Sequence, residues 1–122
     1  MPAIPPVILK KLYVKGSLKA EEEGFSLALK NTIAPGTIVG LKGLELDGQP
    51  VPLEQMTVAL EGEEERAATS ITADAPLSFS LGAKFTLRVT GTSLPPGSHT
   101  LKIHVVVQDV GPLEIPVSDR VA

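Results

Sequence analysis

One long alternating segment, residues 97–108, restricts the fold of this sequence more than any other feature. From Leu101 to Val107 every second residue is aliphatic, and the residues between them are Lys102, His104 and Val106. Alternation places the two sets of side chains on opposite faces of a strand, so the segment predicts a half-buried strand. Val106 lies on the face that would otherwise be polar, and we expect it to be an apolar residue at the surface.

Shorter alternating runs recur along the chain, and Gly or Pro residues separate most of them. They predict strands at residues 7–14, 25–30, 37–39, 44–46, 56–60, 77–81, 84–90 and 113–117. The dipeptide Asp47-Gly48 predicts a two-residue hairpin turn, and Gly40 and Gly43 predict a bulge or bend in a strand. Together these signals predict about nine short strands and an all-β fold, an antiparallel β-sandwich or jelly roll.

The chain of 122 residues fits one domain. Three prolines within residues 1–6 favour an extended backbone, so we expect residues 1–7 to form an extended N-terminal arm and residues 8–122 to form the β-sandwich domain. The first residues lack the basic segment of a signal peptide, and no apolar run is long enough to cross a membrane. A cytoplasmic location without membrane attachment is therefore expected.

The composition restricts the class of partner. A net charge of −3 argues against nucleic acid, and the absence of cysteine excludes thiolate chemistry. Aromatic residues make up only 3% of the chain, which argues against the aromatic platforms of conventional sugar-binding sandwiches. Hydrophobic residues make up 43%, so a small domain is expected to leave apolar surface that another chain could cover.

No set of residues predicts a catalytic or metal site. His99 and His104 are five residues apart on one strand, so they should face opposite sides and cannot ligate one metal. Ser98, His104 and Asp109 could be combined into a triad on paper, but no nucleophile elbow frames the serine. The acidic runs 21–23 and 63–65 lack the spacing of a calcium loop. We therefore predict no catalytic, cofactor-binding or metal-binding residue in this chain.

The apolar excess predicts a candidate partner interface at the N-terminal arm, at the segment beside Gly40 and on the outer face of the long strand. Two interpretations stay open, because either another polypeptide or a wrapped arm or second sheet of the same chain could cover these residues. The candidate interface residues are Ile4, Val7, Ile8, Ile38, Val39, His104 and Val106.

Three groups of segments resemble the small β subunit of bacterial carbon-glycoside deglycosidases. They are residues 9–18, residues 24–31 leading into 34–38, and residues 94–101 with 111–115. The resemblance covers nearly the full length and implies a β-sandwich that is the non-catalytic subunit of a lyase complex in carbohydrate metabolism. It implies as partner a larger (β/α)₈-barrel subunit of the sugar isomerase and epimerase type. That barrel would carry a divalent metal such as Mn and would cleave the carbon–carbon bond of 3-oxo-glycosides.

Other functions remain open from the sequence. The chain could be a stand-alone carbohydrate- or protein-binding sandwich that uses an exposed edge strand such as residues 51–53. It could also be a metal-dependent enzyme in its own right, which is the hypothesis with the least support from the residues. Self-association is open as well.

Overall fold

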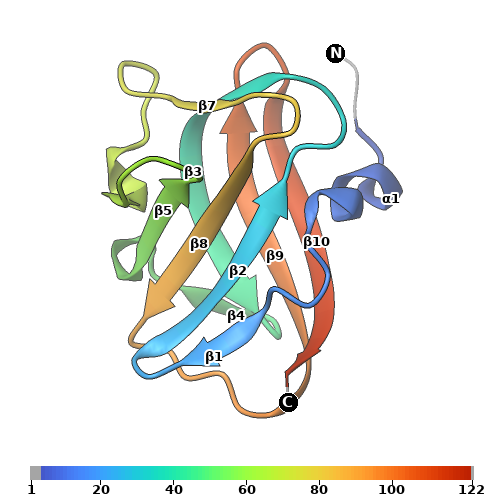
Figure 1. The fold of residues 1–122 in the computed structure, drawn as a ribbon, viewed down its shortest axis with the longest axis vertical. Helices are drawn as coiled ribbons and strands as arrows, with labels where there is room; N and C mark the ends of the chain where they lie inside the picture. The colour runs from blue at the N-terminus through green and yellow to red at the C-terminus, as the bar shows by residue number, and fades with distance from the viewer. Residues whose placement is uncertain (1–3, 122) are drawn as a thin grey trace.

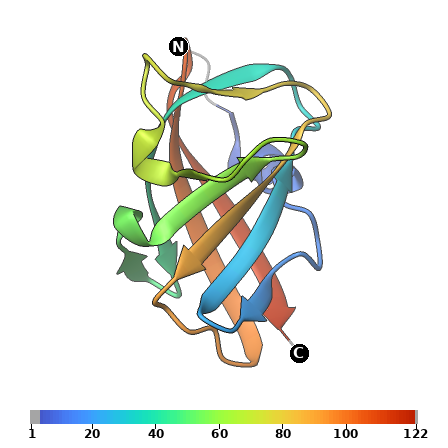
Figure 2. The same cartoon turned by 60° about the vertical axis from the view of Figure 1, so that its left-hand side comes forward.

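The chain folds into two antiparallel β-sheets packed face to face, as a computed structural model of residues 4–121 shows (Figure 1). The all-β sandwich predicted from the alternating segments is confirmed. In the view of Figure 2 the strands of one sheet cross in front of those of the other. The buried aliphatic side chains fill the space between the two layers.

The first sheet has five strands in the order β1, β2, β8, β5 and β6. Their bounds are β1 (Lys19–Glu21), β2 (Gly24–Lys30), β8 (Lys84–Thr90), β5 (Met56–Leu60) and β6 (Arg66–Ala67). The second sheet has the order β10, β9, β3 and β4, and β7 pairs with the start of β3. Their bounds are β10 (Gly111–Val121), β9 (Gly97–Val107), β3 (Gly36–Leu46), β4 (Gln49–Val51) and β7 (Leu77–Phe79).

Strand β9 is the long alternating segment of the sequence, and it lies inside the second sheet. It pairs with β10 over all eleven residues and with β3 on its other side. Leu101, Ile103 and Val105 are buried, whereas Lys102 is exposed and His104 is half-buried on the outer face. The predicted two-faced strand is therefore confirmed, and β9 joins the two other long strands of its sheet.

Strand β3 runs without interruption through the two glycines that predicted a bulge. Its register with β9 shifts between Ile38 and Gly40 and again between Leu41 and Gly43. Gly43 has φ +146, a conformation that residues with a Cβ rarely adopt. The predicted bulge is confirmed, and β3 ends in the predicted hairpin, since Asp47 and Gly48 connect it to β4.

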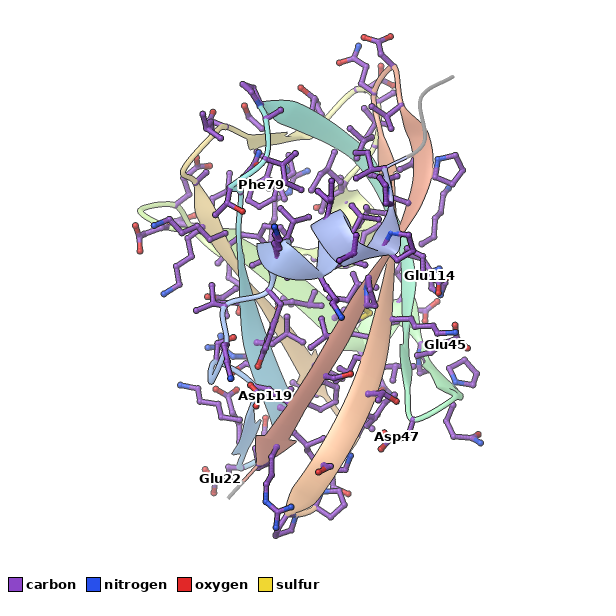
Figure 3. The ribbon with its side chains drawn as sticks, turned by 90° about the vertical axis from the view of Figure 1, so that its right-hand side faces the viewer. Glu22, Glu45, Asp47, Phe79, Glu114 and Asp119 are labelled. Carbon is purple, nitrogen blue, oxygen red and sulfur yellow. The ribbon has the colours of Figure 1, made fainter. Side chains whose placement is uncertain are left out.

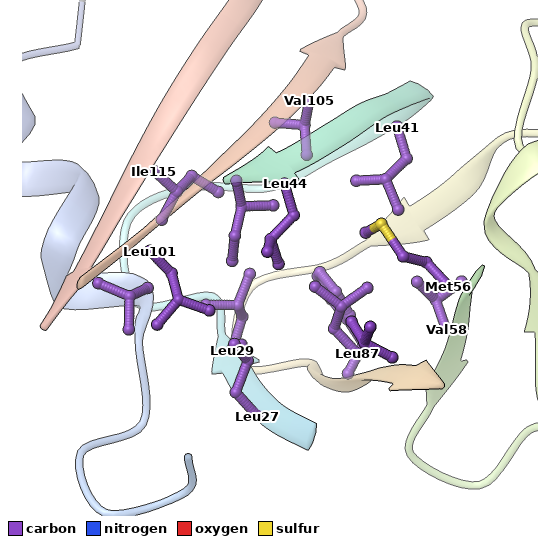
Figure 4. Packing of buried hydrophobic residues seen from close by; sticks show 14 of the residues in the cluster. Leu27, Leu29, Leu41, Leu44, Met56, Val58, Leu87, Leu101, Val105 and Ile115 are labelled. Atoms are coloured by element: carbon purple, nitrogen blue, oxygen red, sulfur yellow. The ribbon is translucent and has the colours of Figure 1, made fainter. Parts of the chain in front are cut away.

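The core is almost entirely aliphatic, as the composition requires. Leu27, Leu29 and Leu87 of the first sheet face Leu44 and Ile115 of the second (Figure 4). Phe79 and Phe85 form an edge-to-face pair with ring centroids 5.0 Å apart. Every second residue of β2, β5, β8 and β9 points into this core, which is the reason the alternating runs predicted strands correctly.

The prediction of a first strand at residues 7–14 is wrong. Residues 6–9 form a short helix, α1 (Pro6–Leu9), and the 3-10 turn η1 (Lys10–Leu12) follows it directly. Pro6 occupies the first turn of α1, where its missing N–H costs nothing, and Leu9 and Leu12 lie three apart and are both buried. Pro5 is extended, and residues 1–3 of the expected arm lie outside the described residues.

Two further 3-10 turns, η2 (Leu53–Gln55) and η3 (Ala68–Ser70), connect strands at the edges. Residues 53–55 are therefore a turn, and the expected edge strand is limited to β4, which ends at Val51. None of the helices in residues 4–121 is long and apolar enough to cross a membrane.

Candidate functional site

The exposed apolar residues of the described chain concentrate on α1. Val7 is 60% exposed and Ile8 is 36% exposed, whereas Leu9 of the same helix is buried in the core. Ile4, just before the helix, is half-buried and packs against the core. We call the exposed pair Val7 and Ile8 the α1 ridge, and it is the part of the candidate interface that lies open to solvent.

Ile38 of β3 does not lie at the surface, because it is only 4% exposed and packs in the core of the sandwich. The glycines beside it suggested an open edge, but β3 pairs with β9 on one side and with β7 on the other. Val39 is half-buried in the same strand. Of the two interpretations of this segment, the one in which elements of the same chain cover Ile38 is correct.

His104 and Val106 lie on the outer face of the second sheet, as the alternation predicted, and both are half-buried. The His104 Nε2 is 2.9 Å from an oxygen of Glu45 on β3, and its Nδ1 is 4.0 Å from an oxygen of Glu114 on β10. Lys102 Nζ lies 3.6 Å from the other oxygen of Glu114. Figure 3 shows Glu45 and Glu114 on this face.

This arrangement ties three neighbouring strands together through side chains. Each carboxylate faces a different nitrogen of the His104 ring, so the three groups do not point at a common position where an ion could bind. Among residues 4–121 there is no group of three acidic, histidine or cysteine side chains suited to hold a metal ion. The cluster therefore acts as a cross-strand contact in this structure.

His99 lies near the start of β9. As predicted, it faces the opposite side from His104, and it is 8% exposed. Its Nδ1 is 2.6 Å from Asp47 Oδ2 in the β3–β4 turn, and its Nε2 is 2.6 Å from the carbonyl oxygen of Pro95. The hydrogen bond with Asp47, followed by that with the Pro95 carbonyl, raises the pKa of His99.

An imidazole with an acceptor at each nitrogen is satisfied only when both nitrogens carry a proton. The charged form of His99 therefore fits this site best. The backbone N–H of Thr100, followed by His99, lowers the pKa of Asp47. No local pattern indicates this contact, because Asp47 and His99 are 52 residues apart.

Tyr13 and Asp119 form a second long-range contact that the sequence did not indicate. The Tyr13 hydroxyl donates to Asp119 Oδ2 at 2.6 Å and accepts from the N–H of Leu18 at 2.9 Å. The N–H of Gly16 donates to the same Asp119 oxygen at 2.7 Å. Burial, followed by the bond to Asp119, raises the pKa of Tyr13, and the hydrogen bond from Tyr13 lowers the pKa of Asp119.

These three polar clusters connect separate elements and leave no reactive group free. Every buried side-chain nitrogen or oxygen in the described residues has a hydrogen-bond partner. Ser98 and Asp109 do not approach His104 in any contact of the structure: Ser98 is exposed in β9, and Asp109 lies in the turn between β9 and β10 with φ +66.

The sequence matches one family model over nearly the whole sandwich. The family is described as hydroxymethylglutaryl-CoA reductase, N-terminal domain, and the match covers residues 8–122. The chain belongs to this family. The match thus spans all ten strands of the described residues and most of the N-terminal helical segment. The chain has no significant sequence match among curated proteins.

Membership of the reductase N-terminal-domain family shows that the resemblance to the small subunit of carbon-glycoside deglycosidases was wrong. The segments that suggested it are alternating runs with Pro-Gly and Gly-Pro turns, and these occur in antiparallel sandwiches of many families. The function as a subunit of a lyase complex acting on carbon-glycosides is corrected with it. The expected barrel partner and its divalent metal were implied by that resemblance alone.

Proposed function

We propose that this chain is a non-catalytic domain of a hydroxymethylglutaryl-CoA reductase, and that it binds the catalytic part of that enzyme through a protein–protein contact. The observation that carries the proposal is the family match over residues 8–122, which assigns the whole sandwich to the N-terminal domain of such reductases. The chemistry would then reside outside this chain.

The hydrogen bonds that the polar side chains form within the fold support a non-catalytic role. Both nitrogens of His99 and the hydroxyl of Tyr13 are held by structural partners within 3 Å, and His104 lies between two carboxylates. A general acid or base needs a proton position that can reach a substrate. These groups instead fix the turns and strands of the sandwich.

The α1 ridge supports a contact with protein. Val7 and Ile8 are held in place by the burial of Leu9 and Leu12, so the ridge is presented on an ordered helix. Burial of exposed aliphatic side chains contributes roughly 25 cal/mol per Å² of apolar area. We propose the α1 ridge as part of the contact, together with Val39 of β3 and the outer-face residues His104 and Val106.

Two measurements test the proposal. The purified chain, supplied with hydroxymethylglutaryl-CoA and reduced nicotinamide nucleotides, should not reduce the thioester. Sedimentation of the chain with the catalytic reductase polypeptide should show a complex. Turnover by the isolated chain would refute the non-catalytic role, and independent sedimentation of the two at micromolar concentration would refute the contact.

A pair of matched variants tests the α1 ridge. The double substitution Val7→Ser with Ile8→Ser should weaken the complex roughly tenfold, because two partly exposed aliphatic side chains no longer contribute apolar area. Leu81→Ser is the control, since Leu81 is 59% exposed in the loop after β7 and lies outside the ridge. Equal weakening by both variants would contradict a contact at α1.

A cytosolic location is also part of this proposal. Fractionation of cells that express the full-length protein tests it, with recovery in the membrane pellet as the contrary result.

A further inference from the structure

A pocket of about 150 Å³ with apolar walls, partly open to solvent, lies at one end of the sandwich, outside the polar clusters. It lies where β9 ends, β10 begins and the β2–β3 connection crosses, and α1 and η1 cover its side. In Figure 3, α1 lies across the opening between the two sheets, beside Phe79. Its walls are apolar side chains from both sheets and from the helical segment, among them Leu9, Leu12, Phe79, Phe85, Val107 and Ile115.

The cavity offers a ligand no free hydrogen-bonding side chain. Among the described residues, Asn31 is the one polar side chain in its lining, and it is 3% exposed. The Asn31 amide nitrogen donates to the carbonyl oxygens of Ala34 at 2.7 Å and Phe79 at 2.8 Å. Its oxygen accepts from the N–H groups of Ile33 at 3.1 Å and Ala34 at 3.3 Å. A polar ligand group would lose its hydration here without a replacement, so the site selects apolar molecules.

The volume fits a small ligand. Protein interiors are normally packed without voids of this size, because the atoms that line a void lose their contacts. An apolar pocket of about 150 Å³ has room for a molecule of the size of benzene. The cover over the cavity is short, since α1 has four residues and is followed at once by a 3-10 turn. The pocket is partly open to solvent, so a small ligand can enter without displacement of this cover.

We propose that this cavity is a binding site for one small apolar molecule of about the size of benzene, held by dispersion and by release from water. The site is independent of the proposed reductase contact, because the α1 ridge faces solvent whereas Leu9 faces the cavity. Phe79 and Phe85 present aromatic surface to the ligand, and aliphatic residues form most of the remaining lining.

Titration of the full chain with benzene, followed by the methyl signals in NMR spectra, tests this site. Saturable shifts should be confined to the methyl groups that line the cavity, and saturating benzene should raise the melting temperature. Phenol, which has a similar shape, should bind at least roughly tenfold more weakly, because its hydroxyl finds no partner. Absence of saturable shifts, or equal binding of phenol, would overturn the proposal.

Two variants with a matched control complete the test. Gly36→Val places side-chain atoms in the lining, where an added Cβ would lie 3.7 Å from Val107 Cγ1, and should weaken benzene binding at least roughly tenfold. The control Thr37→Val changes the next residue of β3, which does not line the cavity, and should leave binding unchanged. Unchanged benzene binding by a folded Gly36→Val protein would contradict the site.

Leu113→Ala provides a second variant if Gly36→Val does not fold. Leu113 is half-buried and lines the cavity, so its truncation enlarges the space. The enlarged cavity should bind butylbenzene more tightly than the unmodified protein does. Equal or weaker binding of butylbenzene would count against the location proposed here.

Discussion

At the scale of single residues, the most informative contacts are those in which one side chain binds a backbone group and a second side chain at once. Asp47 holds the N–H of Thr100 at 2.8 Å with one oxygen and His99 with the other. It has φ +50 in the hairpin turn, a conformation that Asp and Asn tolerate better than most residues. The β3–β4 turn is thereby attached to the start of β9.

The pH dependence of this contact follows from the two pKa shifts. Because the pKa of His99 is raised in the folded state, its contribution to the stability of the fold is complete below the unfolded pKa of 6.5. This contribution is lost as the pH rises through the folded-state pKa. The lowered pKa of Asp47 means that its contribution is present above the unfolded pKa of 3.8 and is lost as the pH falls through the folded-state pKa. The pair therefore stabilises the fold most between these two unfolded pKa values.

Asp47→Asn tests this contact, because it removes the charge and keeps both the turn conformation and an oxygen for Thr100. Asp47 is 46% exposed and screened by water, so we expect a loss of less than about 1 kcal/mol. Urea unfolding should show the largest loss in the free energy of unfolding near pH 5–6. The loss should become smaller at higher pH, as His99 loses its proton. A loss that is the same at pH 5.5 and at about pH 9 would contradict the role of charge.

Gly24 illustrates a glycine required by space. A Cβ at this position would lie 1.9 Å from the carbonyl oxygen of Val89 on the neighbouring strand β8. Backbone cannot move aside as a flexible side chain can, so any larger residue must displace β2 from β8.

Gly24→Ala should therefore destabilise the protein by about 1–3 kcal/mol, the usual cost of overpacking. The control is Gly40→Ala, whose Cβ would be 3.5 Å from the end of the Lys42 side chain and should change the stability by less than about 0.5 kcal/mol. Chemical unfolding of both variants measures the difference. Equal stability of the two would show that β2 and β8 can separate at no cost.

At the scale of elements, the segment between η1 and β1 is attached to both sheets. Tyr13 forms an isolated bridge with Leu29 of β2, and its hydroxyl reaches Asp119 of β10. The N–H of Val14 donates to the carbonyl oxygen of Ala28, so the segment also pairs with the edge of β2. Ser26 and Ala28 lie on the outer face of β2 by alternation but are buried, and the Ser26 hydroxyl donates to Glu21 Oε2 at 3.0 Å.

Tyr13→Phe tests the connection. It removes the donor to Asp119 and leaves the N–H of Leu18 without its acceptor, so a loss of about 1–2 kcal/mol is expected in urea unfolding. A double-mutant cycle with Asp119→Asn separates the pairwise contribution, because the two substitutions share one hydrogen bond. Additive losses would mean that the hydroxyl and the carboxylate do not stabilise each other.

At the scale of the whole molecule, two sheets share one aliphatic core, and the N-terminal helical segment covers one side of it. The core includes residues from Leu9 to Val121, so nearly the entire described chain contributes to it. The cavity lies at the end of this core beneath α1, whereas the polar clusters lie at its edges and outer faces. Apolar ligand binding and partner binding are thus assigned to different parts of the sandwich.

Local patterns predicted much of this molecule. Alternation identified β2, β5, β8 and β9 with their buried faces, and Asp47-Gly48 identified the β3–β4 hairpin, because these features depend on neighbours within a few residues. The helical start was missed because Val7, Ile8 and Leu9 are also strand formers, and their helix depends on Pro6 and on burial against β10. The family was misjudged from turn patterns that many sandwiches share.

The sequence alone determined the all-β class and the faces of the main strands, since periodicity is a local property. Only the tertiary structure decided that Asp47 meets His99, that Tyr13 meets Asp119, that Ile38 is covered and that a cavity remains beneath α1. These features depend on which strands become neighbours and on how the two sheets close over the core. Strand order and packing arise from the contacts of the whole chain, and no short segment specifies them.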